Sequence, residues 1–381
     1  MALVPASQLV IEPVRTGWQR KQWLSLPWKT NAGDPCWVPP LRRNQKQLAG
    51  FLKHPVWDDA EIETFLATRG GAPVGRIAAV VNHAHNRWHE DQVGFFGFFE
   101  SIEEQAVADG LFESAGAWLA ERGMKVVRGP MNPTLNYELG MLVDGFATPP
   151  FFLLTHNPAY YGGLVEGAGF EKAQDLYGYW GDVSMLDELN RDTKTANVDV
   201  MVRERFGVNV RGMDPKNFDA EVEMFLDIYN RALTNTWGYV PMSRSEVIHF
   251  AADLKRLIVP DLARIAEIDG RAVGVMFGLL DYNPRIKAID GRLFPFGFLK
   301  LLSDKKKLNR IRLMSTNVLP EYQSWGVGVS LARSVLQPAL DHGVNACEFS
   351  WVLESNDLSR KTIEKSRARL YKTWRIYDKQ L

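Results

Sequence analysis

The feature that most limits the fold is an internal repeat with a spacing of 199 residues. A G-x-x-V-G turn lies between two apolar runs at residues 66–82, and the same pattern recurs at residues 265–283. The glycines that end the two turns, Gly75 and Gly274, have the same separation as the two N-x helix openings at Asn157 and Asn356. A repeat at a fixed spacing is the signature of a duplicated structural unit, so two copies of one fold are expected.

Both copies continue with the same order of elements. The shared elements are strands at 93–100 and 311–319, helices at 102–122 and 325–342, and strands at 126–129 and 346–353. Strands that alternate with helices in this way form mixed sheets with helices on both faces. The sequence therefore predicts an α/β protein with two units, residues 1–190 and 191–381, joined through a polar segment at 184–206.

The charge balance excludes several classes of function. Lys plus Arg and Asp plus Glu each number 45, so no net field favours nucleic acid. Cys36 and Cys347 form no disulfide framework, and no apolar run reaches the roughly 20 residues that span a bilayer. The first residues lack the basic and apolar regions of a signal peptide. A cytoplasmic globular protein without a nucleic-acid partner is expected.

A glycine-containing segment directly before the helix of the second copy predicts an anion site. Glycines expose backbone N–H groups, and a helix N-terminus adds unpaired donors and a partial positive charge, which together bind phosphate groups. The expected binding residues are Val318 and Leu319 at the end of the strand, followed by Gln323, Ser324, Trp325, Gly326, Val327 and Gly328.

The order of strand, glycine loop, helix, strand and Asn-led helix resembles the GNAT acyltransferases. Gln323, Gly326 and Gly328 occupy the fixed positions of the superfamily motif Q/R-x-x-G-x-G/A, and the first copy keeps a closing N-x-x-A/Y…G-F element at 157–170. The whole chain thus resembles a tandem GNAT protein. The segments GFFGFFES, WGYVP and LFPFG are similar to those of proteins near the bacterial ceramide synthases, which N-acylate a sphingoid base. The resemblance implies acyl-CoA as co-substrate and no metal. Asn356 either contacts the acyl-CoA or caps its own helix.

The chain departs from the GNAT pattern in both copies. The first copy has Glu100, Glu103 and Glu104 where the phosphate loop belongs and has no glycine pair, so it is expected to have lost cofactor binding. In the second copy the position of the superfamily's tyrosine acid falls on Ile363. A thiol with a pKa of about 8.5 leaves without strong acid assistance, so transfer remains feasible.

Three further residues are expected near the reaction. Glu354 ends an apolar strand and is the predicted general base, the alternative being a hydrogen bond to the following loop. Backbone N–H groups of residues 317–319, at an expected bulge, would hold the oxyanion. Trp237 and Tyr239 either line the amine site or anchor a loop by packing.

Two segments admit competing interpretations. His83, His85 and His89 form a metal-like cluster, but no Cys or carboxylate pattern completes it, and a solvated loop is favoured. Lys305–Lys307 follow the apolar run LFPFGFLKLL. This segment is either a buried hairpin arm with a solvated end or a surface that contacts lipid at the inner membrane face.

The predicted function is acyl-CoA-dependent N-acylation of a small-molecule or lipid amine by one working copy. The 12 Trp and 20 Phe residues favour a long acyl chain or a lipid-like acceptor. Two alternatives stay open at this point: an acetyltransferase for a small polar amine, and an acyl-CoA-binding scaffold of the same fold without turnover.

Overall fold

The two copies of the repeat fold into hairpins with the same register. Ala67 lies opposite Gly75 in the first hairpin, Ala266 lies opposite Gly274 in the second, and a bulge follows at the same place in each. The repeat is therefore structural as well as sequential. The hairpins are β2 (Ala60–Arg69) with β3 (Ala72–Asn82), and β11 (Ala263–Ile268) with β12 (Arg271–Leu280).

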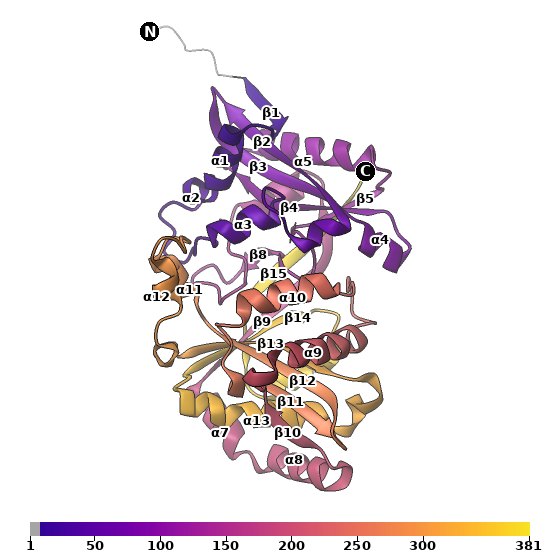
Figure 1. Ribbon diagram of the computed structural model, residues 1–381. Helices are drawn as coiled ribbons and strands as arrows, with labels where there is room; N and C mark the ends of the chain where they lie inside the picture. The colour runs from indigo at the N-terminus through magenta and orange to yellow at the C-terminus, as the bar shows by residue number, and fades with distance from the viewer. Residues whose placement is uncertain (1–7) are drawn as a thin grey trace. The chain divides into compact units, whose positions relative to one another are not determined.

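The computed structural model describes residues 8–381, which form two units (Figure 1). Unit 1 contains the described residues up to Asp175, Arg285–Gly297 and Thr373–Leu381, and unit 2 contains Leu176–Pro284 and Phe298–Lys372. The predicted division at residue 190 follows the sequence repeat and stays a prediction. The compact units divide the chain first at residue 175, and two later segments, 285–297 and 373–381, return to unit 1.

Each unit contains a mixed sheet. In unit 1 the strand order is β1-β2-β3-β4-β5-β15, and in unit 2 it is β9-β14-β13-β12-β11-β10. Strands β9 and β15 each contribute residues to both units. The remaining strands are β1 (Leu9–Pro13), β4 (Val93–Ser101), β5 (Val126–Gly129), β6 (Met131–Asn132), β7 (Glu138–Leu139), β8 (Met141–Asp144), β9 (Glu171–Asp182), β10 (Asn209–Gly212), β13 (Arg310–Val318), β14 (Ala346–Leu353) and β15 (Arg369–Gln380).

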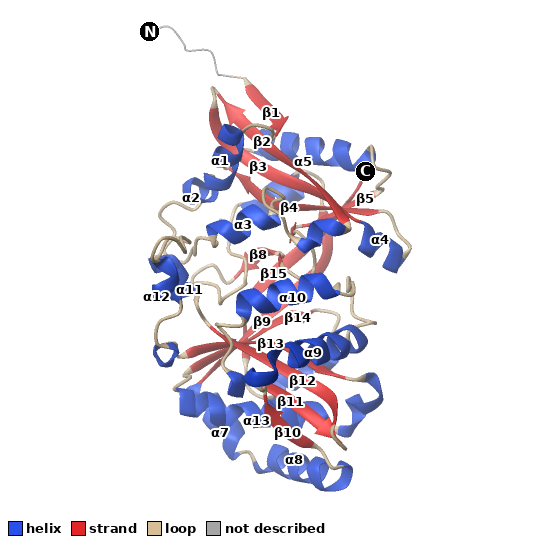
Figure 2. Cartoon of the chain, in the orientation of Figure 1, coloured by secondary structure: helices blue, strands red, loops and turns tan. Residues whose placement is uncertain are grey.

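Helices cover these sheets, as the secondary-structure colours of Figure 2 show. Those that begin before residue 176 are α1 (Gly17–Ser25), α2 (Pro27–Thr30), α3 (Arg42–Leu48), α4 (His83–His89), α5 (Gln105–Ala120) and α6 (Tyr161–Gly167). Those that follow are α7 (Val183–Arg191), α8 (Thr193–Phe206), α9 (Phe218–Ala232), α10 (Arg244–Leu254), α11 (Asn283–Ala288), α12 (Gly297–Leu301), α13 (Val327–His342) and α14 (Asp357–Lys365). No helix within residues 8–381 has the length and apolar character needed to cross a bilayer.

The sheet of unit 1 has helices on both faces. Successive side chains of a strand point to opposite faces. Accordingly, Ile77 and Ala79 of β3 pack in one core with Leu111 of α5, whereas Ala78 between them packs with Trp23 of α1. The two cores show why an almost fully apolar β3 is needed, because both of its faces are buried.

The sheet of unit 2 repeats this arrangement. Val275 of β12 packs with Ile228 of α9 on one face, and the adjacent Gly274 faces Leu331 of α13 on the other. In unit 1 the equivalent Gly75 faces Leu111 of α5. Both glycines let a helix approach its sheet closely. The predicted α/β fold, with helices on both faces of each mixed sheet, is confirmed.

The structure corrects two local predictions. The polar segment 184–206, expected as a linker, forms α7 and α8. The segment with three histidines, expected as a solvated loop, forms helix α4, and His85 is buried inside the unit. Burial lowers the pKa of His85 to about 3, so this imidazole is neutral at physiological pH. Within residues 8–381 no three His, Cys, Asp or Glu side chains gather as metal ligands do.

Candidate active site

Two parallel strands separate at the centre of unit 2. Strand β13 pairs with β14 from Arg310 opposite Ala346 to Leu313 opposite Phe349, where the pairing ends. On its other side β13 stays paired with β12 as far as Val318. Beyond Leu313, the edge of β13 that faces β14 is therefore not paired with that strand. Open α/β sheets bind ligands where neighbouring strands diverge.

The backbone donors along this edge can be assigned from the ladder. The Leu319 N–H donates to the Val273 carbonyl at 2.9 Å, so this amide faces β12. Because donors alternate along a strand, the amides of Thr316 and Val318 face the β14 side. The expected bulge at residues 317–319 lies instead at Met314, and the Leu319 amide is already engaged. Val318 is the last residue of β13 that pairs with β12, and its binding role stays a prediction.

The glycine loop lies directly after this strand. Residues Pro320–Trp325 form a 3₁₀ turn, and Gly326 then adopts a φ of 87°, which favours glycine. Helix α13 begins at Val327, and no side chain within residues 8–381 caps it. A Cβ built on Gly328 would meet no described atom within 4 Å. The helix N-terminus is thus open to an anion, as a pyrophosphate requires.

Helix α8 packs against the first part of the same loop. A Cβ on Gly326 would lie 2.9 Å from the Val202 side chain of α8, so this glycine also serves close packing. Trp325 stacks on Phe206 with ring centroids 4.5 Å apart and contacts Tyr322 edge-on. Trp325 is therefore an anchor for α8, which explains an aromatic residue at this loop position.

The two polar residues of the loop are both exposed and differ in their hydrogen bonding. Gln323 Nε2 donates to the Val318 carbonyl at 3.1 Å, which ties the loop to the end of β13. Ser324 is exposed. Neither side chain caps helix α13, whose N-cap residue is Gly326.

Glu354 and Asn356 lie just after β14. Glu354 directly follows the last residue of β14, beyond the part of that strand that pairs with β13. Glu354 is half-buried in the turn, and its backbone carbonyl accepts from Arg360 Nη1 at 2.8 Å. Asn356 caps α14 by accepting from the Ser359 N–H at 3.0 Å, the structural role that the sequence had left open.

The two aromatic residues assigned to the amine site lie between α9 and α10. Tyr239 is almost completely buried, and its hydroxyl donates to Asn230 Oδ1 at 2.7 Å. Burial raises the pKa of Tyr239, so it stays protonated. This geometry corresponds to the packing interpretation for Tyr239. Trp237 is partly exposed.

A buried polar cluster that sequence reasoning missed lies where β13 and β14 separate. Arg312 donates to Ser350 Oγ at 3.0 Å, Ser350 donates to Glu348 Oε1 at 2.5 Å, and the Tyr371 hydroxyl donates to the other oxygen of Glu348. Burial raises the pKa of Glu348 to about 7, an effect that the Arg312 charge opposes. The sequence signal for this cluster is that two charged residues, Arg312 and Glu348, occur inside otherwise apolar strands.

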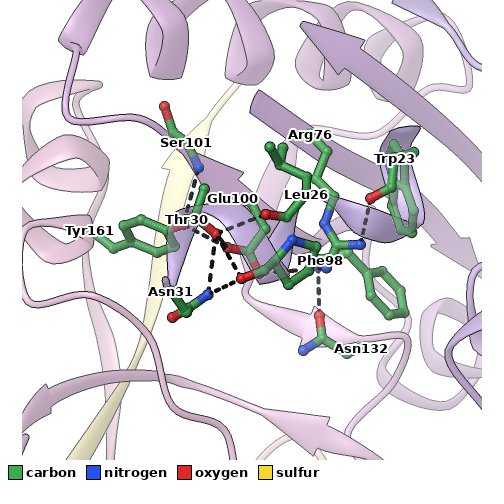
Figure 3. A network of polar contacts seen from close by, with 11 residues as sticks. Trp23, Leu26, Thr30, Asn31, Arg76, Phe98, Glu100, Ser101, Asn132 and Tyr161 are labelled. Atoms are coloured by element: carbon green, nitrogen blue, oxygen red, sulfur yellow. Dashed lines mark hydrogen bonds and ion pairs between the residues drawn. The ribbon is translucent and has the colours of Figure 1, made fainter. Parts of the chain in front are cut away.

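In unit 1 the corresponding edge is filled. Strand β4 pairs with β5 only through Phe95, and the next segment of β4 lies against β6. The Met131 carbonyl occupies the place where a Cβ of Gly97 would be. Asn132 Oδ1 accepts from the Phe98 N–H at 2.6 Å, and Phe98 has a φ of 52° (Figure 3). Protein atoms thus use the strand edge that is open in unit 2.

The Glu100 carboxylate of unit 1 points into a polar network (Figure 3). Its Oε2 accepts from Thr30 Oγ1 and from the Tyr161 hydroxyl, both at 2.6 Å, and Arg76 lies 3.5 Å from Oε1. Burial lowers the pKa of Arg76 to about 10, which still leaves it charged at neutral pH. Glu104, at the start of α5, pairs with Arg69 at 2.6 Å.

Comparisons with known proteins agree with this architecture. No family model matches the chain. The chain is 36% identical over 384 residues to the bacterial ceramide synthase of Caulobacter vibrioides (strain NA1000 / CB15N), covering 98% of both chains. It is 31% identical over 371 residues to Protein YghO of Escherichia coli (strain K12), covering 95% of this chain and 93% of that protein.

A solved structure has the same tandem fold. A tandem GNAT protein from the clavulanic acid biosynthesis pathway superposes with a TM-score of 0.56 at 12% identity, over 98% of both chains. The predicted tandem GNAT fold is thereby confirmed. The chain belongs to the bacterial ceramide synthase family of N-acyltransferases.

Proposed function

We propose that this protein transfers an acyl group from acyl-CoA to an amine, and that the acyl chain or the amine is lipid-like. The observation that carries the proposal is the combination in unit 2 of a strand edge that opens after Leu313 and an uncapped helix N-terminus with an open Gly328. A pyrophosphate fits the helix N-terminus, and an amide-containing arm fits the free donors of the strand edge. The name of the Caulobacter relative, a ceramide synthase, supports a lipid amine.

The chemistry assigned to the site is aminolysis of a thioester. The amine nitrogen attacks the carbonyl carbon, a C–N bond forms, and the C–S bond breaks to release a thiolate that takes up a proton. Glu354 accepts the proton that the nitrogen loses, and the amides of Thr316 and Val318 lie along the strand edge. Asn356 is assigned a contact to acyl-CoA in addition to the hydrogen bond with which it caps α14. Trp237 is assigned to the wall of the amine site, and Tyr239 anchors the same loop by packing.

Only unit 2 is assigned a working acyl-CoA site. In unit 1 the edge of β4 is used by Met131 and Asn132, and Glu104 stands at the start of α5. A carboxylate at this position repels a pyrophosphate, although it suits the helix dipole. The first unit is therefore proposed to bind no acyl-CoA of its own.

Acyl-CoA binding is expected to protect the backbone amides of residues 323–328 from hydrogen exchange, while residues 97–104 keep their exchange rates. The reason is that a bound pyrophosphate hydrogen-bonds the amides of the loop. Exchange measured by mass spectrometry with and without acyl-CoA tests this. Protection confined to residues 97–104 would place the acyl-CoA site in unit 1 and contradict the proposal.

We further propose that the segment Arg292–Lys300 contacts a membrane containing anionic lipids. Phe294 and Phe296 are 68% and 73% exposed, and Arg292 and Lys300 are exposed beside them in the chain. The alternative of a buried hairpin arm is therefore wrong for the two phenylalanines. Apolar side chains with neighbouring cations suit an anionic lipid surface.

The basic run Lys305–Lys307, which follows this segment, has two exposed lysines instead of three. Lys306 and Lys307 are exposed, whereas Lys305 Nζ donates to the Ile258 carbonyl at 2.9 Å. Burial lowers the pKa of Lys305. Lys305 thus belongs to the fold of unit 2, and replacing it would test stability as well as lipid contact.

The double variant Phe294→Ser/Phe296→Ser is expected to bind anionic vesicles at least roughly tenfold more weakly than the wild type, because each buried Phe contributes about 1.5–3 kcal/mol. Sedimentation with phosphatidylglycerol vesicles measures this. The matched control is Leu358→Ser, which removes an apolar side chain that is 79% exposed elsewhere. Equal binding by the double variant and the wild type would refute the lipid contact.

A further inference from the structure

The side chain of Asn317 is a buried donor without a protein acceptor. Asn317 lies on β13 beyond the last residue paired with β14, and the residue is only 3% exposed. Its Nδ2 has no hydrogen-bond partner among the described residues. A buried amide that lacks a partner costs free energy, and native proteins keep such groups rarely and usually for a reason.

The internal repeat shows what the same position does in unit 1. Ser101 lies opposite Gly75 and Val318 lies opposite Gly274, and the two glycines are equivalent by the repeat. The residues before them, Glu100 and Asn317, are therefore equivalent. In unit 1 this position is satisfied by Thr30, Tyr161 and Arg76. In unit 2 the residue opposite Asn317 is the apolar Val275, where unit 1 has Arg76.

The location of Asn317 selects the kind of ligand atom. Asn317 lies opposite Val275, so its side chain is on the α9 face of the sheet, in the part of β13 that no longer pairs with β14. An amide Nδ2 only donates, so its partner must be an acceptor. An ammonium group offers no acceptor, whereas a thioester carbonyl does.

We propose that Asn317 Nδ2 donates a hydrogen bond to the carbonyl oxygen of the acyl thioester and stabilises the oxyanion formed from it. This inference rests on the proposed function. When the amine nitrogen bonds to the carbonyl carbon, the π electrons move to the oxygen, which becomes negative. They return when the C–S bond breaks, and the sulfur leaves with its electron pair. A donor at this oxygen lowers the barrier because it binds the charged state more strongly than the neutral one.

The test is Asn317→Leu, an apolar replacement of similar size. The kcat for acyl transfer is expected to fall by about 10²–10³-fold, the usual loss for one oxyanion donor. The Kd for acyl-CoA should change little. The melting temperature should rise or stay the same, because the variant removes an unsatisfied buried amide. Asn317→Ala, measured in the same way, reports whether the volume of the side chain matters.

A structural role for Asn317 gives a different result. If the amide supports the fold, Asn317→Leu lowers the melting temperature and kcat falls only with the folded fraction. An unchanged kcat in a folded variant also overturns the inference. Failure of the proposed function is distinct, because then the wild-type protein itself transfers no acyl group to long-chain or short amines.

Discussion

Replacing Glu354 by Gln is expected to slow acyl transfer by roughly 10²–10⁴-fold, the range for loss of a general base. A primary amine has a pKa of about 10.4, so few molecules are nucleophilic at neutral pH and a proton acceptor has much to contribute. Gln keeps the size of the side chain and cannot accept the proton. Affinity for acyl-CoA should not change, because the glycine loop is separate. Single-turnover kinetics after saturation with acyl-CoA measures the chemical step.

Asp357→Asn is the matched control for this experiment. Asp357 is an exposed acid three residues further along, in the first turn of α14. The Asp357→Asn substitution removes one negative charge from the same segment. It therefore separates the loss of a proton acceptor from a general electrostatic effect. A Glu354→Gln enzyme that turns over at the wild-type rate, with chemistry limiting, would exclude Glu354 from the mechanism.

Long-chain acyl-CoA is expected to exceed acetyl-CoA in kcat/KM by at least about tenfold. Each CH₂ group removed from water contributes about 0.8 kcal/mol, so eight additional methylenes add several kcal/mol of gross binding. Ordering the chain offsets part of this gain. Rates with acetyl-, octanoyl- and palmitoyl-CoA, measured against long-chain amines and polyamines below their micelle thresholds, test the prediction.

The competing acetyltransferase interpretation predicts the opposite order. A preference for acetyl-CoA together with a small polar amine would replace the lipid-like substrate with a metabolite and leave the N-acyltransferase assignment intact. A preference for a long-chain amine with no effect of acyl length would place the lipid recognition on the acceptor alone. The two substrate series are therefore varied independently.

The sequence predicted those parts of the site that depend on local order. The helix starting at Val327 and the strand Ala346–Leu353 lie within two residues of the predicted bounds. Turns, glycine positions and apolar runs are properties of short segments, so the sequence carries them directly. The equal register of the two hairpins also follows from a pattern visible in the sequence.

The remaining parts depend on contacts between distant segments. Nothing in the sequence around Gly326 announces that Val202 will pack on it, and Met131 lies more than thirty residues from the Gly97 edge that it fills. The unsatisfied amide of Asn317 is equally non-local, because Thr30 and Tyr161 satisfy the equivalent residue in unit 1. Single-sequence patterns carry no information on such pairings.

The exchange of strands between the units has a consequence for how the protein is made. Trp374, Ile376 and Tyr377 of β15 are completely buried, and residues Tyr377–Gln380 pair with β5 of unit 1. Unit 2 obtains its β9 residues before most of its own chain has been synthesised. Unit 1, by contrast, cannot complete its core until the ribosome has added residues 373–380. The portion of the chain that is translated first therefore completes its core only with the last strand, and its apolar surface stays exposed during that interval.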